Sequence, residues 1–329
     1  MSAGMETAIA RPRLFDKAVL LHLAVLAALF LVQFVVGDYQ HLSLARVMVL
    51  ATYAVGYNIL FGYTGLLSLG HAMFFAAGLY GAGLTATHLS FGVPAAFVAG
   101  IVSGLALSFV IGLIALRTTG VAFMIVTMMF AQAGYLIVLY FGAFTRGDEG
   151  IVLTGDIRTA HLLGLTLDLT SATVRYNLAL GLLAVAVLLC LALVRSPTGR
   201  VLVAIRENEE RARMLGYDTF RAKLFALVVS GTFAATSGAA YGLMFAYVGA
   251  TFASIQYSIL PLLWVLLGGV GTVLGPLVGT LLMFYLVDFT SGYTSAYMLV
   301  VGVALLGLVV WFPKGLLGTL REKRAPWLP

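Results

Sequence analysis

Charge is scarce in this sequence. Only 10% of its 329 residues are Asp, Glu, Lys or Arg, whereas 61% are apolar. A soluble globular domain has about 25% charged and roughly 45–50% apolar residues. The composition therefore excludes an ordinary soluble domain and indicates an integral membrane protein. Long apolar runs from end to end leave no room for a separate soluble domain, so residues 1–329 are predicted to form a single transmembrane domain.

Cysteine is almost absent as well. Cys190 is the only one, which excludes a disulfide within the chain, and its place inside an apolar run predicts a small packed side chain. The sequence also lacks the motifs of nucleotide, metal and hydrolase sites: G-x-x-x-x-G-K-[ST], H-E-x-x-H, G-x-S-x-G and any Cys/His cluster. We therefore expect no enzyme activity, no metal and no cofactor in this chain.

Ionisable groups deep in the apolar runs are few. Asp38 and Asp288 fall near outer run ends, and His22 and His71 fall near the starts of their runs; His71 is the most interesting of these. Ion-coupled transporters usually place charged groups within their spans. The scarcity of such groups here argues against a self-powered transporter. A packed, hydrogen-bonded His71 is favoured over a proton relay. Arg46, near a run end, is interpreted as an interfacial anchor.

The apolar runs predict an all-α polytopic protein with about ten transmembrane helices. Their expected ranges are 18–36, 44–61, 66–87, 93–115, 118–142, 176–194, 224–246, 255–267, 272–289 and 294–312. With a cytoplasmic N-terminus, fifteen of the nineteen Lys and Arg residues fall in inside segments. The excess follows the positive-inside rule. Both termini are therefore expected to be cytoplasmic, with an outer loop at 143–175 and an inner loop at 195–223.

Glycine gathers in two blocks, at 62–83 and 268–279. Such blocks allow either close helix packing or broken helices whose unwound backbone lines a path, and both interpretations stay open. The residues expected to form the structural breaks are Gly62, Gly65, Gly70, Gly268, Gly271, Gly275 and Pro276.

The inner loop 195–223 carries the densest charge, in "RENEERARMLGYDTFRAK" (206–223). A single helix over 199–215 would place Val201, Ala204, Ile205, Asn208, Ala212 and Leu215 on one face. It would also form three i,i+4 ion pairs: Arg206 with Glu210, Glu207 with Arg211, and Glu209 with Arg213. Gly216 is expected to end this helix, and Asp218 to cap the following span.

Two surfaces suit such an amphipathic helix, a lipid leaflet or a protein groove. Anionic lipid favours an excess of Lys and Arg on the polar face. From 206 to 213 the sequence has three Arg and three Glu. The balance favours a protein groove.

Four blocks in order, "GYTGLLSLGHAMFFAAGLYGAG" (62–83), "RENEERARMLGYDTFRAKLFALV" (206–228), "LLGGVGTVLGPLVG" (266–279) and "WFPKGLLG" (311–318), carry a family resemblance. The sequence resembles the permease subunits of branched-chain amino-acid ABC importers, in particular the LivM-like member of the permease pair. The resemblance implies that the inner loop holds the coupling helix that docks on a cytoplasmic ATPase.

The positions implied in coupling are Arg206, Glu207, Asn208, Glu209, Glu210, Arg211, Ala212 and Gly216. Glu210 and Arg211 depart from the family pattern, which expects an apolar or small residue at these places. The outer stretch "FTRGDEGI" (144–151) also resembles a family motif, with Arg146 in place of its first glycine. It is interpreted either as a solvated turn or as a contact for a periplasmic binding protein or the entering solute.

The resemblance implies a permease subunit in the bacterial inner membrane. Its partners would be a second homologous permease, two cytoplasmic ATPases that bind ATP and Mg, a periplasmic solute-binding protein and membrane lipid, with no nucleic acid. The solute would be a branched-chain amino acid or a related small polar solute such as urea, an amide or a small carboxylate. Polar residues expected to face the path are Asn58, Ser68, His71, Thr127, Gln132 and Tyr241. The alternative is a self-contained secondary transporter or channel.

Overall fold

A computed structural model of the chain describes residues 17–162, 165–312 and 314–323. The α-helices are α1 (Lys17–Val32), α2 (Asp38–Asn58), α3 (His71–His88), α4 (Val93–Ala115), α5 (Gly120–Tyr140), α6 (Gly142–Thr145), α7 (Ala172–Arg195), α8 (Pro197–Glu207), α9 (Glu209–Met214), α10 (Thr219–Phe245), α11 (Ile255–Gly268), α12 (Gly275–Ser291), α13 (Tyr297–Trp311) and α14 (Leu316–Lys323). The remaining elements are the π-helix η1 (Ile59–Tyr63), the 3-10 helices η2 (Gly155–Arg158) and η3 (Ala250–Ala253), and the strands β1 (Ile151–Val152), β2 (Thr159–Leu162), β3 (Leu165–Asp168) and β4 (Tyr247–Val248).

The architecture is that of an all-α multi-pass membrane protein. Each predicted span is occupied by a helix: α1 to α5, α7 and α10 to α13. Five helical segments are long and apolar enough to cross a bilayer: Asp38–Tyr63, Val93–Ala115, Gly120–Tyr140, Ala172–Arg195 and Thr219–Phe245. The full number of crossings and the sides of the termini stay predictions.

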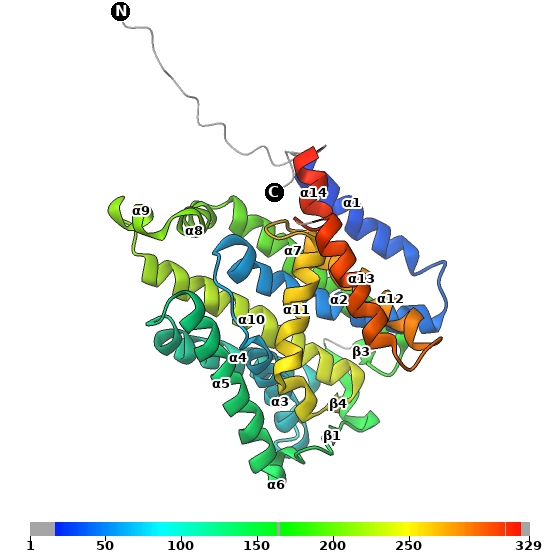
Figure 1. Cartoon of the computed structure of the whole chain (residues 1–329). Helices are drawn as coiled ribbons and strands as arrows, with labels where there is room; N and C mark the ends of the chain where they lie inside the picture. The colour runs from blue at the N-terminus through cyan, green and yellow to red at the C-terminus, as the bar shows by residue number, and fades with distance from the viewer. Residues whose placement is uncertain (1–16, 163–164, 313, 324–329) are drawn as a thin grey trace, which may run out of the picture.

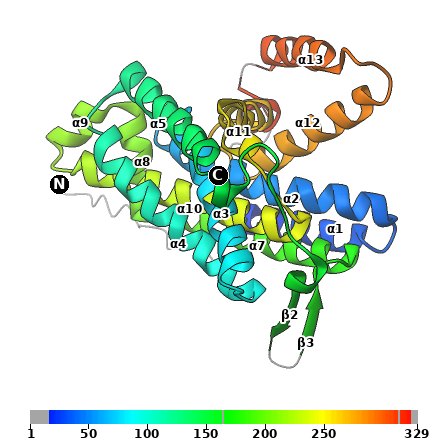
Figure 2. The same ribbon diagram turned by 90° about the horizontal axis from the view of Figure 1, so that it is seen from below.

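The two central helices are α2 and α10, which pack against each other (Figures 1 and 2). α3 and α4 pack on α10, and α7 and α12 pack on α2. Glycine makes the α3–α10 contact possible, because a Cβ atom at Gly78 would lie 1.9 Å from the carbonyl oxygen of Ala235. Small residues allow this backbone approach in membranes, where helix association depends on close packing.

Both expected helix breaks are present. α2 passes into the π-helix η1, and residues 64–70 have no helical structure before α3 begins. α11 ends at Gly268 and α12 begins at Gly275. We call residues 62–70 the first glycine loop and residues 268–275 the second glycine loop.

The segment 143–175 contains short strands that the sequence did not predict. β1 pairs antiparallel with β4, directly after α10, and β2 pairs with β3 in a hairpin that projects from the helices (Figure 2). Backbone groups outside a helix need partners, and these ladders supply them. Within 144–151, Ile151 pairs with Val248 of β4, whereas Arg146, Asp148 and Glu149 are exposed in the turn before it.

The two ends of the molecule differ. α8, α9 and α14 lie toward one end, and α6, β1 and β4 lie toward the other (Figure 1). The positive-inside pattern predicts that the first is the cytoplasmic end.

Candidate functional site: the α8–α9 segment and the glycine loops

The charged inner segment is two helices, not the single helix predicted over 199–215. α8 ends at Glu207, Asn208 is extended with φ −161°, and α9 starts at Glu209. The Asn208 side-chain oxygen accepts a hydrogen bond of 2.9 Å from the backbone N–H of Arg211. Asn208 therefore caps a new helix, as a short polar side chain does well, and does not belong to an apolar face.

The break at Asn208 also removes two of the three predicted ion pairs. Glu209 and Arg213, both in α9, form their pair at 3.3 Å. The other two predicted pairs join residues on opposite sides of the break, and neither forms among the described residues. Glu207, Glu210 and Arg211 are all exposed, and their charges remain available to a partner.

The end of α9 follows the prediction. Gly216 has φ +89°, and the N–H of Tyr217 donates to the carbonyl of Ala212 at 3.2 Å, which closes the helix in a Schellman arrangement. Asp218 caps α10, because its side chain accepts a hydrogen bond of 3.0 Å from the backbone N–H of Arg221.

The apolar face is only partly as predicted. Ile205 and Ala212 are buried, as is Leu202, which was not on the predicted list. Leu215 was predicted to pack inward, yet it is 72% exposed beside Met214 at 83% and Tyr217 at 47%. We call Met214, Leu215 and Tyr217 the α9 tip.

α9 is fixed to α10 by a partly buried ion pair. The ammonium of Lys223, whose side chain is 6% exposed, lies 2.7 Å from Glu209, whose side chain is 29% exposed. Burial raises the pKa of Glu209, but the hydrogen bond and charge of Lys223, with help from Thr219 and Arg213, outweigh it and hold the pKa below its ordinary value. The Glu209 carboxyl is therefore ionised at neutral pH.

α8 is fixed to the first glycine loop by Arg206. Its guanidinium donates a hydrogen bond to the carbonyl oxygen of Gly62. The aliphatic part of the Arg206 side chain lies over Gly65, where an added Cβ atom would be 3.1 Å from Cγ of Arg206. Gly65 has a φ of +77°. Gly65 therefore supplies both the left-handed backbone and the space that Arg206 occupies.

The two glycine loops meet beneath Arg206. A Cβ atom on Gly62 would lie 2.8 Å from the backbone nitrogen of Gly271. Asn58, fully buried at the end of α2, binds the second loop: its amide accepts from Gly271 N–H at 3.0 Å and donates to the Thr272 carbonyl at 2.9 Å. Unwound backbone at membrane depth needs such partners. The Asn58 amide thus fixes the second glycine loop to the end of α2, four residues before the first loop begins.

The C-terminal helix α14 reaches the second glycine loop from another side. Arg321 donates a hydrogen bond of 3.0 Å to the backbone carbonyl of Gly271. A Cβ atom on Gly269 would lie 2.6 Å from the backbone nitrogen of Gly318, so α14 packs closely on the loop. Of the predicted breaks here, Gly268 ends α11, while Gly275 and Pro276 open α12.

Three other predicted path residues anchor the first glycine loop. The Ser68 hydroxyl accepts from Gly70 N–H at 3.2 Å, and Thr127 of α5 accepts from Leu69 N–H at 3.3 Å. His71 is fully buried, with Nε2 2.7 Å from the hydroxyl of Ser230 in α10. The packed, hydrogen-bonded interpretation of His71 is confirmed by this placement.

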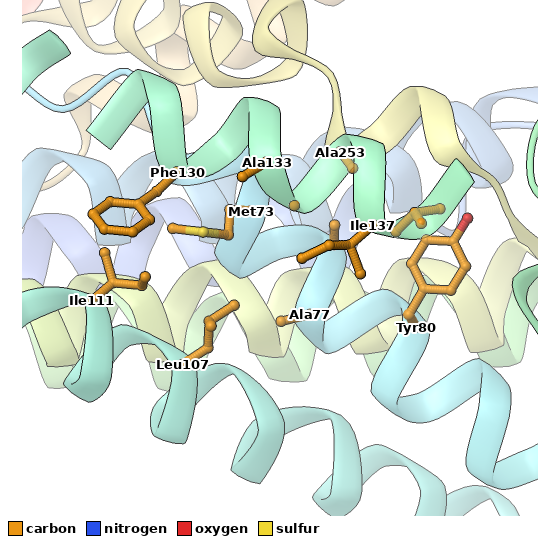
Figure 3. A pocket seen from close by; sticks show the side chains of 12 residues that line it. Met73, Ala77, Tyr80, Leu107, Ile111, Phe130, Ala133, Ile137 and Ala253 are labelled. Atoms are coloured by element: carbon orange, nitrogen blue, oxygen red, sulfur yellow. The ribbon is translucent and has the colours of Figure 1, made fainter. Parts of the chain in front are cut away.

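Gln132 and Tyr241 lie apart from this group. Gln132 is half-buried on α5, and Tyr241 is half-buried on α10 within a set of aromatic rings. A pocket of about 310 Å³ lies between α3, α4 and α5, lined by apolar side chains such as Met73, Leu107 and Phe130 (Figure 3). None of the six predicted path residues lines it.

Residues 41–310 match the sequence profile of a family described as branched-chain amino acid transport system / permease component. The chain belongs to this family. The permease is similar to the high-affinity branched-chain amino acid transport system permease protein LivM of Escherichia coli (strain K12), with 28% identity over 295 residues that cover 84% of this chain and 69% of the relative. LivH of the same strain is 25% identical over 284 residues, which cover 82% of this chain and 91% of the relative. A probable LivM of Methanocaldococcus jannaschii is 33% identical over 90 residues, 27% of this chain and 26% of the relative.

The permease is accordingly a membrane transport subunit and not an enzyme. Two of its anchoring residues, Lys223 and Arg321, were not predicted as functional. Both carry a charge near a predicted span end, where the positive-inside rule already accounts for a cation. Their roles appear only when α9 and the second glycine loop are placed beside them.

Proposed function

We propose that this chain is one of two permease subunits of an ABC importer in the bacterial inner membrane. With a second homologous permease it forms the translocation path. Two cytoplasmic ATPases, which bind ATP and Mg, drive it through the α8–α9 segment, and a periplasmic binding protein delivers the solute. The proposed solute is a branched-chain amino acid or a related small polar solute, by analogy with the names of the relatives.

The observation that carries the proposal is the α9 tip with its surrounding charges. Met214 and Leu215 are exposed apolar side chains at the end of a charged helix, next to unpaired Glu210 and Arg211. A lipid-bound helix would bury its apolar residues among cationic neighbours. An apolar centre with a mixed polar rim is typical of a protein interface.

The anchoring of this segment supports transmission of movement. An ATPase that displaces the α9 tip would act on α10 through Glu209 and Lys223, and on the glycine loops through α8 and Arg206. Because Asn58 joins the end of α2 to the second glycine loop, one displacement would reach α2, α11 and α12 together. Alternating access requires such a coupled shift between two discrete arrangements.

Reconstitution tests the proposal against the self-contained alternative. The expected result is uptake of radiolabelled leucine into proteoliposomes only when both permeases, both ATPases, ATP and the binding protein are present. Uptake by this chain alone under an ion gradient would contradict it. Deleting residues 207–216 should abolish co-purification of the ATPases while membrane insertion persists, and undiminished co-purification would contradict the coupling role.

A further inference from the structure

Arg46 occupies an unusual position on the central helix α2. Between His41 and Asn58 it is the one exposed residue of that helix, and every residue from 47 to 58 is buried. A charged side chain in this setting is costly, and within membrane segments such residues mark ligand pathways more often than packing. Arg46 is therefore accessible on the surface of this chain, beside Phe245 and near the α6–β4 end.

The neighbours of Arg46 along the same stripe of α2 are already paired. Tyr39, seven residues before it, donates to the carboxylate of Asp288 at 2.9 Å, and Tyr53, seven residues after it, donates to the Tyr257 carbonyl at 3.3 Å. Within the part of the chain that the structure describes, the Arg46 guanidinium makes no hydrogen bond or ion pair. Its donors are therefore available to a ligand.

Aromatic rings form the wall beside this guanidinium. Its central carbon lies 5.1 Å from the ring centre of Phe245, the last residue of α10. From there the rings continue through Tyr241 (4.8 Å), Phe252 (5.0 Å) and Tyr257 (5.0 Å). The contact with Phe245 orients the planar guanidinium while leaving its edge free.

The surrounding charge adds to the attraction for an anion. Arg175, at the start of α7, lies within electrostatic range of both Arg46 and Arg158. Arg158 donates a hydrogen bond of 2.7 Å to the backbone carbonyl of Met244, the residue before Phe245. Asp168, which accepts from Thr170, offsets part of the charge of Arg158 and Arg175, while Asp288 accepts from Tyr39. Arg46 and Arg158 both reach the end of α10, one at the Phe245 ring and one at the Met244 carbonyl, and two cations at one place raise the local concentration of the opposite ion.

We propose that Arg46 binds the carboxylate of the transported solute as it enters the path, while the solute's apolar part lies against the rings of Phe245 and Tyr241. A guanidinium pairs with a carboxylate through two parallel hydrogen bonds. Neutral urea and amides offer no such anion, so this residue selects small carboxylate-bearing solutes over them. The inference rests on the proposed transport function and specifies its solute.

Uptake by the reconstituted complex provides the first test. R46Q should lower ATP-driven leucine uptake about tenfold or more, because a charge-assisted hydrogen bond is worth at least that factor, and R46K should retain part of it. R117Q removes an exposed arginine elsewhere and should leave uptake unchanged. ATPase co-purification should be equal in all four proteins. Wild-type leucine uptake by R46Q, or full uptake by R46K, would overturn the proposal and restore the interpretation of Arg46 as a lipid anchor.

Direct binding to the permease pair, without binding protein or ATPase, provides the second test. Millimolar leucine should raise the thermal unfolding midpoint of the wild-type pair and not of R46Q, whereas leucinamide, which lacks the carboxylate, should raise neither. Equal shifts with leucine and leucinamide, or no shift with leucine, would overturn the carboxylate site. Failure of ATP-driven uptake together with the predicted binding would instead contradict the proposed importer function.

Discussion

Arg206 of α8 donates a hydrogen bond to the carbonyl oxygen of Gly62, 144 residues earlier in the chain. The same guanidinium lies beside Gly271, where an added Cβ atom would be 3.1 Å from its Nη1 atom. One side chain of the charged inner segment therefore touches both glycine loops. Under the proposed function, Arg206 transmits movement within the permease, and the exposed residues of α9 contact the ATPase.

The meeting of the loops predicts a penalty for Gly62→Ala. Its Cβ would lie 1.9 Å from the Asn58 side-chain oxygen and 2.8 Å from the Gly271 nitrogen. Overpacking of this kind costs about 1–3 kcal/mol. We expect a lower thermal unfolding midpoint for the purified permease in detergent. Gly181→Ala, where nothing lies within 4 Å, is the matched control, and an equal midpoint for both variants would contradict the loop contact.

The pair between Lys223 and Glu209 predicts that removing either partner loosens α9 from α10. Lys223→Met should destabilise this contact by about 1–3 kcal/mol, because it leaves a partly buried carboxylate without its cation. Hydrogen exchange of the α9 amides should then become faster. Glu210→Gln, an exposed residue of the same helix, should leave exchange unchanged, and slow exchange in Lys223→Met would refute the anchoring role.

The same pair predicts how coupling depends on pH. Because the pKa of Glu209 is held below its ordinary value, the pair's stabilisation is complete above the ordinary glutamate pKa and is lost as pH falls through the lowered one. Leucine uptake per ATP hydrolysed should therefore show no titration from this pair between about pH 5 and 8. A loss of coupling on acidification within that range, absent in Glu209→Gln, would contradict the lowered pKa.

The α9 tip predicts a docking defect without misfolding. Met214→Asp places a charge at the centre of the proposed apolar contact, and burying an unpaired charge is strongly unfavourable. ATPase co-purification should fall at least about tenfold. Val152→Asp, at an apolar residue 69% exposed at the other end of the molecule, is the control. Retained co-purification in Met214→Asp would exclude the tip as the docking centre.

The sequence predicted the local features that depend on nearby residues. Each span predicted from a hydrophobic run coincides with a helix. Gly216 and Asp218, predicted to end one helix and to cap the next, mark the end of α9 and the start of α10. The single helix predicted over 199–215 was wrong, although Asn208, a capping residue followed by two glutamates, is itself an N-terminal helix signal. Periodicity suggested one helix and outweighed that signal.

The long-range features could not be predicted from local pattern. The sequence indicated two helix breaks, but nothing in it placed Gly62 against Gly271 or directed the Asn58 amide to Gly271 and Thr272. Polar residues within spans either face a path or satisfy unwound backbone. Asn58, Ser68 and Thr127 do the latter in this structure, and only the folded arrangement distinguishes the two.

Leucine imported per ATP hydrolysed, measured for Arg206→Ala in the reconstituted complex, tests the central claim most directly. Because Arg206 joins α8 to the glycine loops, we expect the ATPases to remain bound and ATP hydrolysis to continue while the ratio falls about tenfold, the effect of one lost charge-assisted hydrogen bond. Arg200→Ala, an exposed arginine of the same helix, should keep the wild-type ratio. A wild-type ratio in Arg206→Ala would contradict transmission through this residue.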